Sequence, residues 1–448
     1  MFRSYQRIAC WILFFVLPWW AAGCSDSSNP ASPPVVGDAP ATVATSWFDL
    51  AYNVVKVGSL PPPSASRIYG YAGVTLYEAL VPGMPGYQSL VGQVNGLTAL
   101  ARTTAAYARP AAEEFHWPLV ANSAMAAILR DFFANGPAAG LDSINRLEDS
   151  LNTQLGQGLA SDVYQRSVDR GKLVASDIFA WSTSDGFAQY SNCAWTPPSG
   201  AGLWVPTPPG FLAALQPCWG QLRTFALVDG QECAPPPPPA YDETPGSPFD
   251  LEMREVYDTA GALTQVQKDI ALFWADGPGV TGTPPGHSIS ILSQVLKAQN
   301  ASLALAAESY AKVGMAVADA FIACWNTKFQ YSYLRPITAI RSLVDSTWLS
   351  FIPTPNFPEY TSGHSVQSGA ASEVMTDLFG PAYAFTDHTH DARGLTPRSF
   401  GSFYEAAGEA ALSRLYGGIH YRSAIENGIT QGRCIGQKVN ALAFKPST

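Results

Sequence analysis

The chain has 448 residues, of which 47% are hydrophobic and 14% are charged, so it can bury a large core. Its formal net charge of -9 and its lack of a basic cluster argue against a nucleic-acid partner, since such partners are bound by concentrated Lys and Arg. Any functional cations must therefore be gathered at one place.

The N-terminus has the order of an export signal. Two arginines precede the apolar run IACWILFFVLPWW, which is too short for a retained membrane span, and small residues lead to Cys24. These small residues resemble a bacterial lipoprotein box, although Ala21 stands where the box usually has leucine. An ordinary cleaved signal and a membrane anchor are the alternatives. We expect a signal peptide over residues 1–23 and a Ser/Pro-rich tether over residues 24–45.

The same region predicts where the protein resides. If Cys24 is acylated after cleavage, Ser25 resembles the residue found in lipoproteins of the outer membrane. We therefore expect the periplasmic face of the outer membrane, or secretion if the signal is simply cleaved. The only membrane contact expected is the lipid anchor.

Helical periodicity dominates the rest of the chain. Helices are expected over residues 64–82, 120–135 and 142–182, where apolar residues recur every three or four positions. Strand-like alternation is scarce and no repeat of fixed period is visible. The fold class predicted is all-α, a single helical bundle over residues 46–446.

Two further features organise the middle of the chain. Residues 190–250 contain TPPSG, TPPG and PPPPP with scattered aromatics, which predicts a long ordered loop rather than a linker. Thr264 and Gln267 form a capping-box pattern that opens the next helix. The buried face of that helix is expected to hold Val266, Ile270, Phe273 and Trp274.

The cysteines indicate disulfides rather than a structural metal site. Cys193, Cys218 and Cys233 lie in the loop-rich stretch of an exported chain, where one pair is plausible. They show no Cys-x-x-Cys spacing and no histidines that complete a zinc set. Cys324 and Cys434 are interpreted as residues of helix cores.

One helical stripe leads to a lysine. It runs through Leu303, Ala307, Tyr310, Gly314, Val317, Phe321 and Trp325, and its next position is Lys328. A buried ammonium is costly unless an anion meets it. The stretch KFQYSYLRP then adds Arg335, so the sequence predicts an anion at this end of the helix.

Two later stretches supply further groups for an anion. Ser362, Gly363 and His364 stand just before an apolar-periodic helix, so they offer a hydroxyl, free backbone N–H groups and an imidazole. In SRLYGGIHYRS, one helix ends at a Gly-Gly pair, across which Arg414 and His420 can converge. An Arg fork suits a tetrahedral oxyanion, to which Lys adds a point charge.

The combined pattern resembles a known signature. Lys328-x6-Arg335-Pro, then Ser362-Gly363-His364, then Ser-Arg414-x5-His420, is similar to the superfamily of vanadium-dependent haloperoxidases and type-2 phosphatidic acid phosphatases. The stretches ASRIYGYAGVTLYEAL, TPPGHS and DAFIACWNTKFQYSYLRPITAI also resemble exported bacterial members of the haloperoxidase branch. The resemblance covers most of the mature chain, with the anion site within residues 325–426.

The resemblance implies a role for each residue of the pattern. The residues expected to bind the oxygens of vanadate or phosphate are Lys328, Arg335, Ser362, Gly363 and Arg414. His420 matches the axial residue, which binds vanadium in haloperoxidases and attacks phosphorus in phosphatases. His364 matches the acid–base residue, and Lys328 is expected to polarise the peroxide. Trp325 and Phe357 match aromatic residues that line the halide site in chloroperoxidase-like members, although both could instead be core residues.

The function expected is halide oxidation by hydrogen peroxide with vanadate as cofactor. The alternative is an acid phosphatase that hydrolyses phosphomonoesters at the same site through a phosphohistidine. The family often has an aspartate four residues after the axial histidine, where this chain has Ala424. Its loss should weaken a phosphohistidine mechanism, unless Glu426, Asp387 or Asp391 replaces it. A noncatalytic anion-binding protein is the third hypothesis, against which the intact Lys, Arg and His set argues.

Other histidines have simpler interpretations. His287 in TPPGHS is taken as a helix-start residue rather than a second rim of the site. In DHTHD, His388 and His390 could bind a divalent cation with the flanking aspartates, but a solvated loop is favoured. The expected partners are small molecules, and the sequence leaves the oligomeric state open, a homo-oligomer included.

Overall fold

A computed structural model describes residues 35–100 and 115–446 of the chain. The expected signal peptide, Cys24 and most of the expected tether lie outside the described residues. Residues 35–45, expected to belong to the tether, are part of the folded unit. Val36 is fully buried, and the Ala41 N–H donates to the carbonyl of Ala301 across 2.9 Å.

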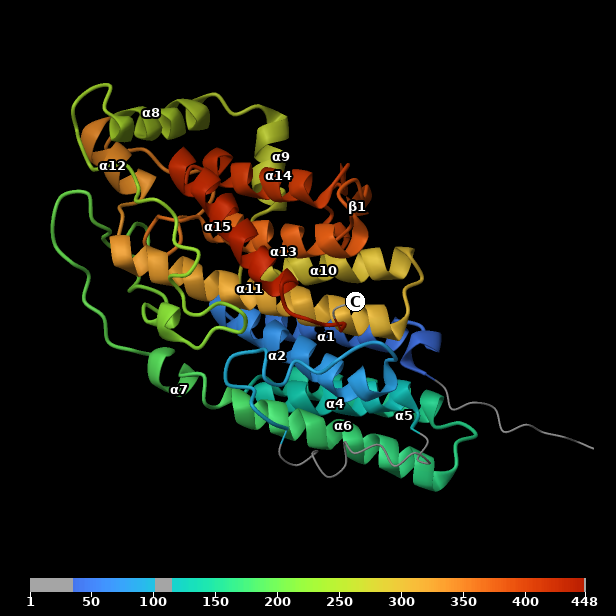
Figure 1. The fold of residues 1–448 in the computed structure, drawn as a ribbon. Coiled ribbons are helices and arrows are strands. Elements are labelled where there is room, and N and C mark those ends of the chain that lie inside the picture. Colours follow the sequence, from blue (N-terminus) through green and yellow to red (C-terminus); the bar gives the residue numbers. More distant parts are fainter. Residues whose placement is uncertain (1–34, 101–114, 447–448) are drawn as a thin grey trace, which may run out of the picture. The chain divides into compact units, whose positions relative to one another are not determined.

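The described part is mostly helical and has very little strand, as the predicted all-α class requires (Figure 1). The helices are α1 (Thr42–Val57), α2 (Pro62–Leu80), α4 (Trp117–Phe132), α5 (Ala138–Leu155), α6 (Ser161–Ser182), α7 (Phe187–Tyr190), α8 (Pro248–Gly261), α9 (Gln265–Phe273), α10 (Thr283–Ala298), α11 (Leu303–Tyr331), α12 (Pro336–Leu343), α13 (Gly363–Phe379), α14 (Phe403–Tyr416) and α15 (Arg422–Asn440). The strands β1 (Phe385–Asp387) and β2 (Arg398–Phe400) form an antiparallel pair in which Phe385 faces Phe400.

The long helix α11 lies at the centre of the bundle, between α2 and α13 (Figure 1). Its expected stripe from Leu303 to Trp325 is buried throughout, and so is Lys328. Helices α2 and α11 approach closely at Gly73 and Gly314. A Cβ on Gly73 would lie 2.3 Å from the carbonyl oxygen of Tyr310, which is too close for any side chain. α11 ends at Ser332, whose φ of 46° turns the chain toward α12.

The long loop before α8 is ordered and packed by aromatics, as predicted. Trp204 and Trp219 are buried. The buried carboxylate of Asp319 on α11 accepts hydrogen bonds from three successive loop N–H groups, the shortest of them 2.6 Å from Phe225. The loop is therefore held directly against the helix that carries Lys328.

Two disulfides fasten this loop. Cys193 pairs with Cys218, which confirms the expected pair in the loop-rich stretch. Cys233 pairs with Cys434 on α15, so the interpretation of Cys434 as a core residue is wrong. Cys324 is free and buried, as expected.

Some local predictions also need correction. The helix expected over residues 142–182 is two helices, α5 and α6, because Gly156 and Gly158 break it. The capping box at Thr264 and Gln267 is confirmed, but Val266 is 64% exposed and does not belong to the buried face of α9. Among the described helices, none is long and apolar enough to cross a membrane.

Candidate active site

The predicted anion-binding residues meet where five helices begin or end. Lys328 lies in the last turn of α11, Arg335 caps the start of α12, and Ser362 caps the start of α13. Arg414 lies in the last turn of α14, and His420 lies just before α15. Helix α13 packs against α11, α14 and α15 (Figure 1).

Lys328 is fully buried, and its ammonium is only partly satisfied by protein. Nζ donates to the carbonyls of Pro358 and Glu359, each across 2.9 Å. Burial, with a smaller contribution from the positive charge of Arg335, lowers the pKa of Lys328 to about 7. The third N–H of the ammonium is available to an anion.

Arg335 is also fully buried. Its Nε donates to the carbonyl of Phe357 and its Nη1 to that of Ile419, each across 2.8 Å. Nη2 is buried and has no hydrogen-bond partner among the described residues. Burial lowers the pKa of Arg335 to about 10, so the guanidinium stays charged at neutral pH.

Ser362 and Gly363 form the N-terminus of α13. The Ser362 hydroxyl accepts a hydrogen bond from the N–H of Ser365 across 3.3 Å, and Ser362 is fully buried. A Cβ on Gly363 would lie 3.8 Å from the Trp325 ring, so the glycine leaves space beside that ring. The first N–H groups of a helix have no intrahelical acceptor and favour an anion.

His364 and Arg414 are held together by one backbone carbonyl, that of Trp274. Arg414 Nη1 donates to this carbonyl across 2.6 Å, and His364 Nε2 lies 3.0 Å from it. The same Nε2 lies 3.1 Å from Arg414 Nη1. Burial and the neighbouring guanidinium hold the pKa of His364 well below its ordinary value. A neutral His364 keeps one unprotonated ring nitrogen that can take a proton.

His420 is 3% exposed and is oriented by a buried carboxylate. Its Nδ1 lies 2.7 Å from Oε1 of Glu359, an oxygen that also accepts the N–H of Tyr421. Burial and the cations Arg335 and Lys328 keep the pKa of His420 well below its ordinary value. The neutral ring therefore carries its proton on Nδ1, which leaves the lone pair of Nε2 facing the cations. Arg335 Nη1 lies 3.3 Å from this Nε2.

Glu359 is the functional residue that the sequence analysis missed. It takes the place of the carboxylate absent at Ala424, whereas the three suggested substitutes are occupied elsewhere. Glu426 is exposed and lies 3.4 Å from Arg422. Asp387 contacts His287, and Asp391 contacts His388. We expected Ala424 to weaken a phosphohistidine mechanism because it leaves His420 without a carboxylate. Glu359 supplies that carboxylate, so this reason no longer holds.

The unsatisfied atoms of the site define what it can hold. Arg335 Nη2, Arg414 Nε and Glu359 Oε2 are buried without a hydrogen-bond partner in the described part of the chain. Two buried guanidinium groups with free N–H groups require an anion, because orphaned buried donors are costly. The donor set fits vanadate or phosphate, held by Lys328, Arg335, Ser362, Gly363, His364, Arg414 and His420.

Trp325 and Phe357 lie beside this anion site. Their ring centroids are 4.9 Å apart. Lys328 Nζ lies 5.1 Å from the Phe357 centroid and 6.0 Å from that of Trp325. The Trp325 indole N–H donates to the carbonyl of Leu215 in the long loop, so its donor is already used. The two rings form an apolar wall next to a buried cation.

The other predicted histidine positions need partial correction. His287 does lie in the first turn of α10, but its side chain is buried between Asp276 and Asp387. In DHTHD, His388 is exposed, as a solvated loop predicts, whereas His390 is 1% exposed. The prediction of a solvated loop is therefore wrong for His390.

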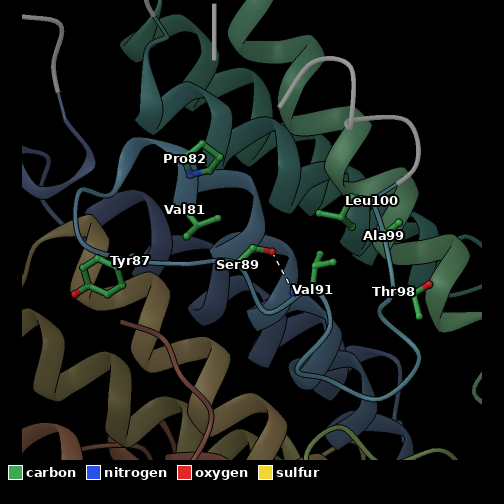
Figure 2. Close-up of a pocket in the computed structure, with 8 residues that line it drawn as sticks. All are labelled: Val81, Pro82, Tyr87, Ser89, Val91, Thr98, Ala99 and Leu100. Atoms are coloured by element: carbon green, nitrogen blue, oxygen red, sulfur yellow. Dashed lines mark hydrogen bonds between the residues drawn. The ribbon is translucent and has the colours of Figure 1, made fainter. Parts of the chain in front are cut away.

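A separate pocket of about 450 Å³ lies away from these residues (Figure 2). Its described lining comes from the segment after α2 and includes Val81, Tyr87 and Leu100. None of the residues of the anion site belongs to this lining.

Comparison with known proteins agrees with this geometry. Residues 308–446 match a family model described as the VCPO second helical-bundle domain. The vanadium chloroperoxidase of Curvularia inaequalis is 26% identical over 212 residues, which cover 34% of this chain and 35% of that enzyme. The chain thus aligns with about a third of that relative's length.

Solved structures extend the similarity over the whole bundle. A bacterial vanadium-dependent chloroperoxidase in its holo form superimposes with a TM-score of 0.66 at 16% identity, covering 86% of this chain and 93% of that one. The first bacterial vanadium-dependent iodoperoxidase superimposes with a TM-score of 0.83 at 36% identity, covering 92% of this chain and 98% of that one. The chain belongs to the vanadium-dependent haloperoxidases.

Proposed function

We propose that the protein binds vanadate and oxidises halide with hydrogen peroxide to hypohalous acid. The observation that carries the proposal is the buried cation cluster around His420, in which Arg335 Nη2 and Arg414 Nε have no protein partner. The membership of the family supports the choice of cofactor. The balanced reaction takes one halide, one peroxide and one proton to hypohalous acid and water.

The cations and the helix N-terminus bind and orient the oxyanion. Arg335 and Arg414 are fixed by backbone carbonyls, so their free N–H groups are already aimed when the anion enters. Such preorganised donors in a buried site cost little rearrangement during the reaction. Glu359 keeps the proton of His420 on Nδ1, so Nε2 is the atom that would hold the vanadium of bound vanadate.

Proton transfer is assigned to His364. Its pKa lies well below the ordinary value, so the ring is neutral at physiological pH and can accept a proton from hydrogen peroxide. The Trp274 carbonyl accepts the Nε2 proton of His364 and so fixes the ring, which leaves Nδ1 as the nitrogen that can take the proton. The proton taken from peroxide can then be returned to the oxygen that leaves as water.

Bound vanadate supplies a Lewis-acidic centre that activates peroxide for two-electron oxidation of halide without changing its own oxidation state. Lys328 is held at the anion site by two backbone carbonyls, so its ammonium would lie beside the bound oxyanion and could polarise a peroxide there. Burial of Lys328 makes this charge stronger than it would be in water.

The halide approaches along the wall formed by Trp325 and Phe357. The two rings exclude water, and the Lys328 ammonium near both rings attracts an anion. We propose iodide as the preferred halide, because the iodoperoxidase is similar along nearly its whole length. Iodide is also the halide that is most easily oxidised and desolvated.

A halide panel tests the function. The purified protein is freed of phosphate and assayed with hydrogen peroxide and iodide, bromide or chloride, before and after orthovanadate is added. We expect oxidation that depends on vanadate and is fastest with iodide. Hydrolysis of phosphate esters that vanadate inhibits, without halide oxidation, would instead establish the phosphatase.

We also propose that the mature protein is exported and acylated at Cys24. Two disulfides in the described part support an oxidising compartment. Mass spectrometry of the protein extracted from membranes tests this, with Cys24→Ser as the variant. A lipid mass on residue 24 that is absent from the variant is the expected result, and an unmodified N-terminus on a soluble protein would contradict it.

A further inference from the structure

A buried cluster of histidines and aspartates lies on the far side of Trp274 from the anion site. Asp276 follows α9, His287 is in the first turn of α10, Asp387 ends β1, and His390 follows β1. All four side chains are at most 1% exposed. The Trp274 ring stacks on the His287 ring, with centroids 4.5 Å apart.

His287 is held by two carboxylates. Its Nδ1 lies 2.8 Å from Asp276 Oδ2, and its Nε2 lies 2.7 Å from Asp387 Oδ2. The Asp387 carboxylate is itself fixed by the backbone N–H of Thr389 across 2.9 Å. The orientation of the His287 ring is therefore fixed, with one nitrogen turned toward Asp276.

His390 is the unexplained member of the cluster. It is buried, and its Nδ1 has no hydrogen-bond partner among the described residues. Its Nε2 lies 3.2 Å from Asp276 Oδ1, an ion-pair distance, but the two atoms are not aligned for a good hydrogen bond. A buried imidazole that has only this contact leaves part of its desolvation uncompensated.

We propose that Asp276, His287 and His390 form a binding site for a divalent transition-metal ion, Zn²⁺ or one with similar ligand preference. One nitrogen from each histidine and one carboxylate oxygen lie within 4.8 Å of one another. Two imidazoles and a carboxylate are typical ligands of Zn²⁺, with a fourth position left for water.

The fourth member of the cluster has the role that such sites require. A metal-bound histidine usually donates its other N–H to a carboxylate, which fixes the ring and strengthens the ligand. Asp387 is placed to accept the Nε2 proton of His287 in this way. Metal binding at Nδ1 displaces the proton shared with Asp276, which leaves to solvent, and no redox step is involved.

The proposed metal site lies next to the chain segment that orients two residues of the anion site. Asp276 is two residues after Trp274, whose carbonyl contacts both Arg414 and His364. A metal would join this segment to the nearby start of α10 and to the chain after β1, which is distant in sequence. The ion would thus stabilise the segment that orients two residues of the anion site.

Metal content of the purified full-length chain tests the site without vanadate. The protein, made without a histidine tag, is stripped with a chelator, reloaded with Zn²⁺, desalted and measured by elemental analysis. We expect about one retained ion per chain, and a rise in the thermal midpoint on Zn²⁺ addition, since a ligand that binds only the folded state stabilises it. Failure to retain any ion would overturn the proposal.

Variants locate the ion. His390→Gln and Asp276→Asn should lose the retained Zn²⁺, whereas His388→Gln is the matched control because the His388 side chain is exposed in the same segment and pairs with Asp391. Equal retention by His390→Gln and His388→Gln would overturn the assignment. If the buried variants do not fold, Co²⁺ loading of the native chain decides. The visible absorption spectrum of Co²⁺ in a tetrahedral site with nitrogen and oxygen ligands would support the proposed site. The spectrum of hexa-aqua Co²⁺ would contradict the proposed site.

Discussion

Glu359 accepts a hydrogen bond from Nδ1 of His420 across 2.7 Å, inside a cluster that otherwise consists of cations. This contact fixes both the orientation and the tautomer of the imidazole. Burial raises the pKa of Glu359 to about 8, and the positive charges of Arg335 and Lys328 oppose this rise. The cluster sets one lysine and two arginines against this single carboxyl group, and an oxyanion has to balance the excess positive charge.

Replacing Glu359 tests its role in positioning the imidazole. Glu359→Ala should lower vanadate affinity or turnover by about 10- to 100-fold, as loss of carboxylates behind metal-binding histidines does. Glu359→Gln should recover part of this, because its amide oxygen still accepts from Nδ1. The measurement is vanadate-dependent halide oxidation over a range of vanadate concentrations. Glu426→Gln is the control, and an equal effect there would contradict the assignment.

Lys328 should make anion binding depend on pH. Its pKa is about 7 in the empty site, and a bound oxyanion favours the charged ammonium. Binding then takes up a proton above pH ~7, so affinity falls as the pH rises. Phosphate affinity measured by calorimetry from pH 6 to 9 should therefore fall more steeply for the native protein than for Lys328→Met. Parallel curves for the two would show that Lys328 does not titrate on binding.

Phe357 should affect the halide more than the cofactor. Aromatic contacts of this kind contribute about 0.5–1.5 kcal/mol, so Phe357→Leu should raise the KM for halide by roughly two- to tenfold. Vanadate affinity should stay close to that of the native protein. The control is Phe329→Leu, because the Phe329 ring packs on Trp195 rather than on Trp325. A loss of vanadate affinity without a change in halide KM would place Phe357 outside the halide path.

The disulfide between Cys233 and Cys434 should stabilise the fold. It joins residues 201 positions apart, and removing such a crosslink typically costs about 2–5 kcal/mol of unfolding free energy. The double variant Cys233→Ser, Cys434→Ser should therefore unfold at lower denaturant concentration, as measured by circular dichroism. Identical midpoints for the variant and the oxidised native protein would show that the crosslink is absent or neutral.

The sequence predicted the cationic part of the site because each residue carries its own local signal. Lys328 continues an apolar stripe, Ser362 caps a helix, and His420 follows a Gly-Gly break. The helix positions follow from periodicity and capping, which act over a few residues. The structure then brings these helix ends together.

Other residues escaped prediction because their environment depends on distant chain segments. Glu359 is an acid between apolar neighbours, a signal that went unused, but its partner His420 is 61 residues away. Periodicity cannot distinguish a core cysteine from a disulfide partner, so Cys434 was misread. His390 lies in a polar stretch, and only packing against Phe273 and His287 buries it.

The most direct test of the central claim is a vanadate titration of the native protein and of His420→Ala. Bound vanadium is measured by equilibrium dialysis, and halide oxidation is measured in the same samples. The account predicts one vanadate per native chain, with activity that rises in proportion to occupancy, and neither tight binding nor activity in His420→Ala. Halide oxidation that is independent of bound vanadium, or that survives in His420→Ala, would contradict it.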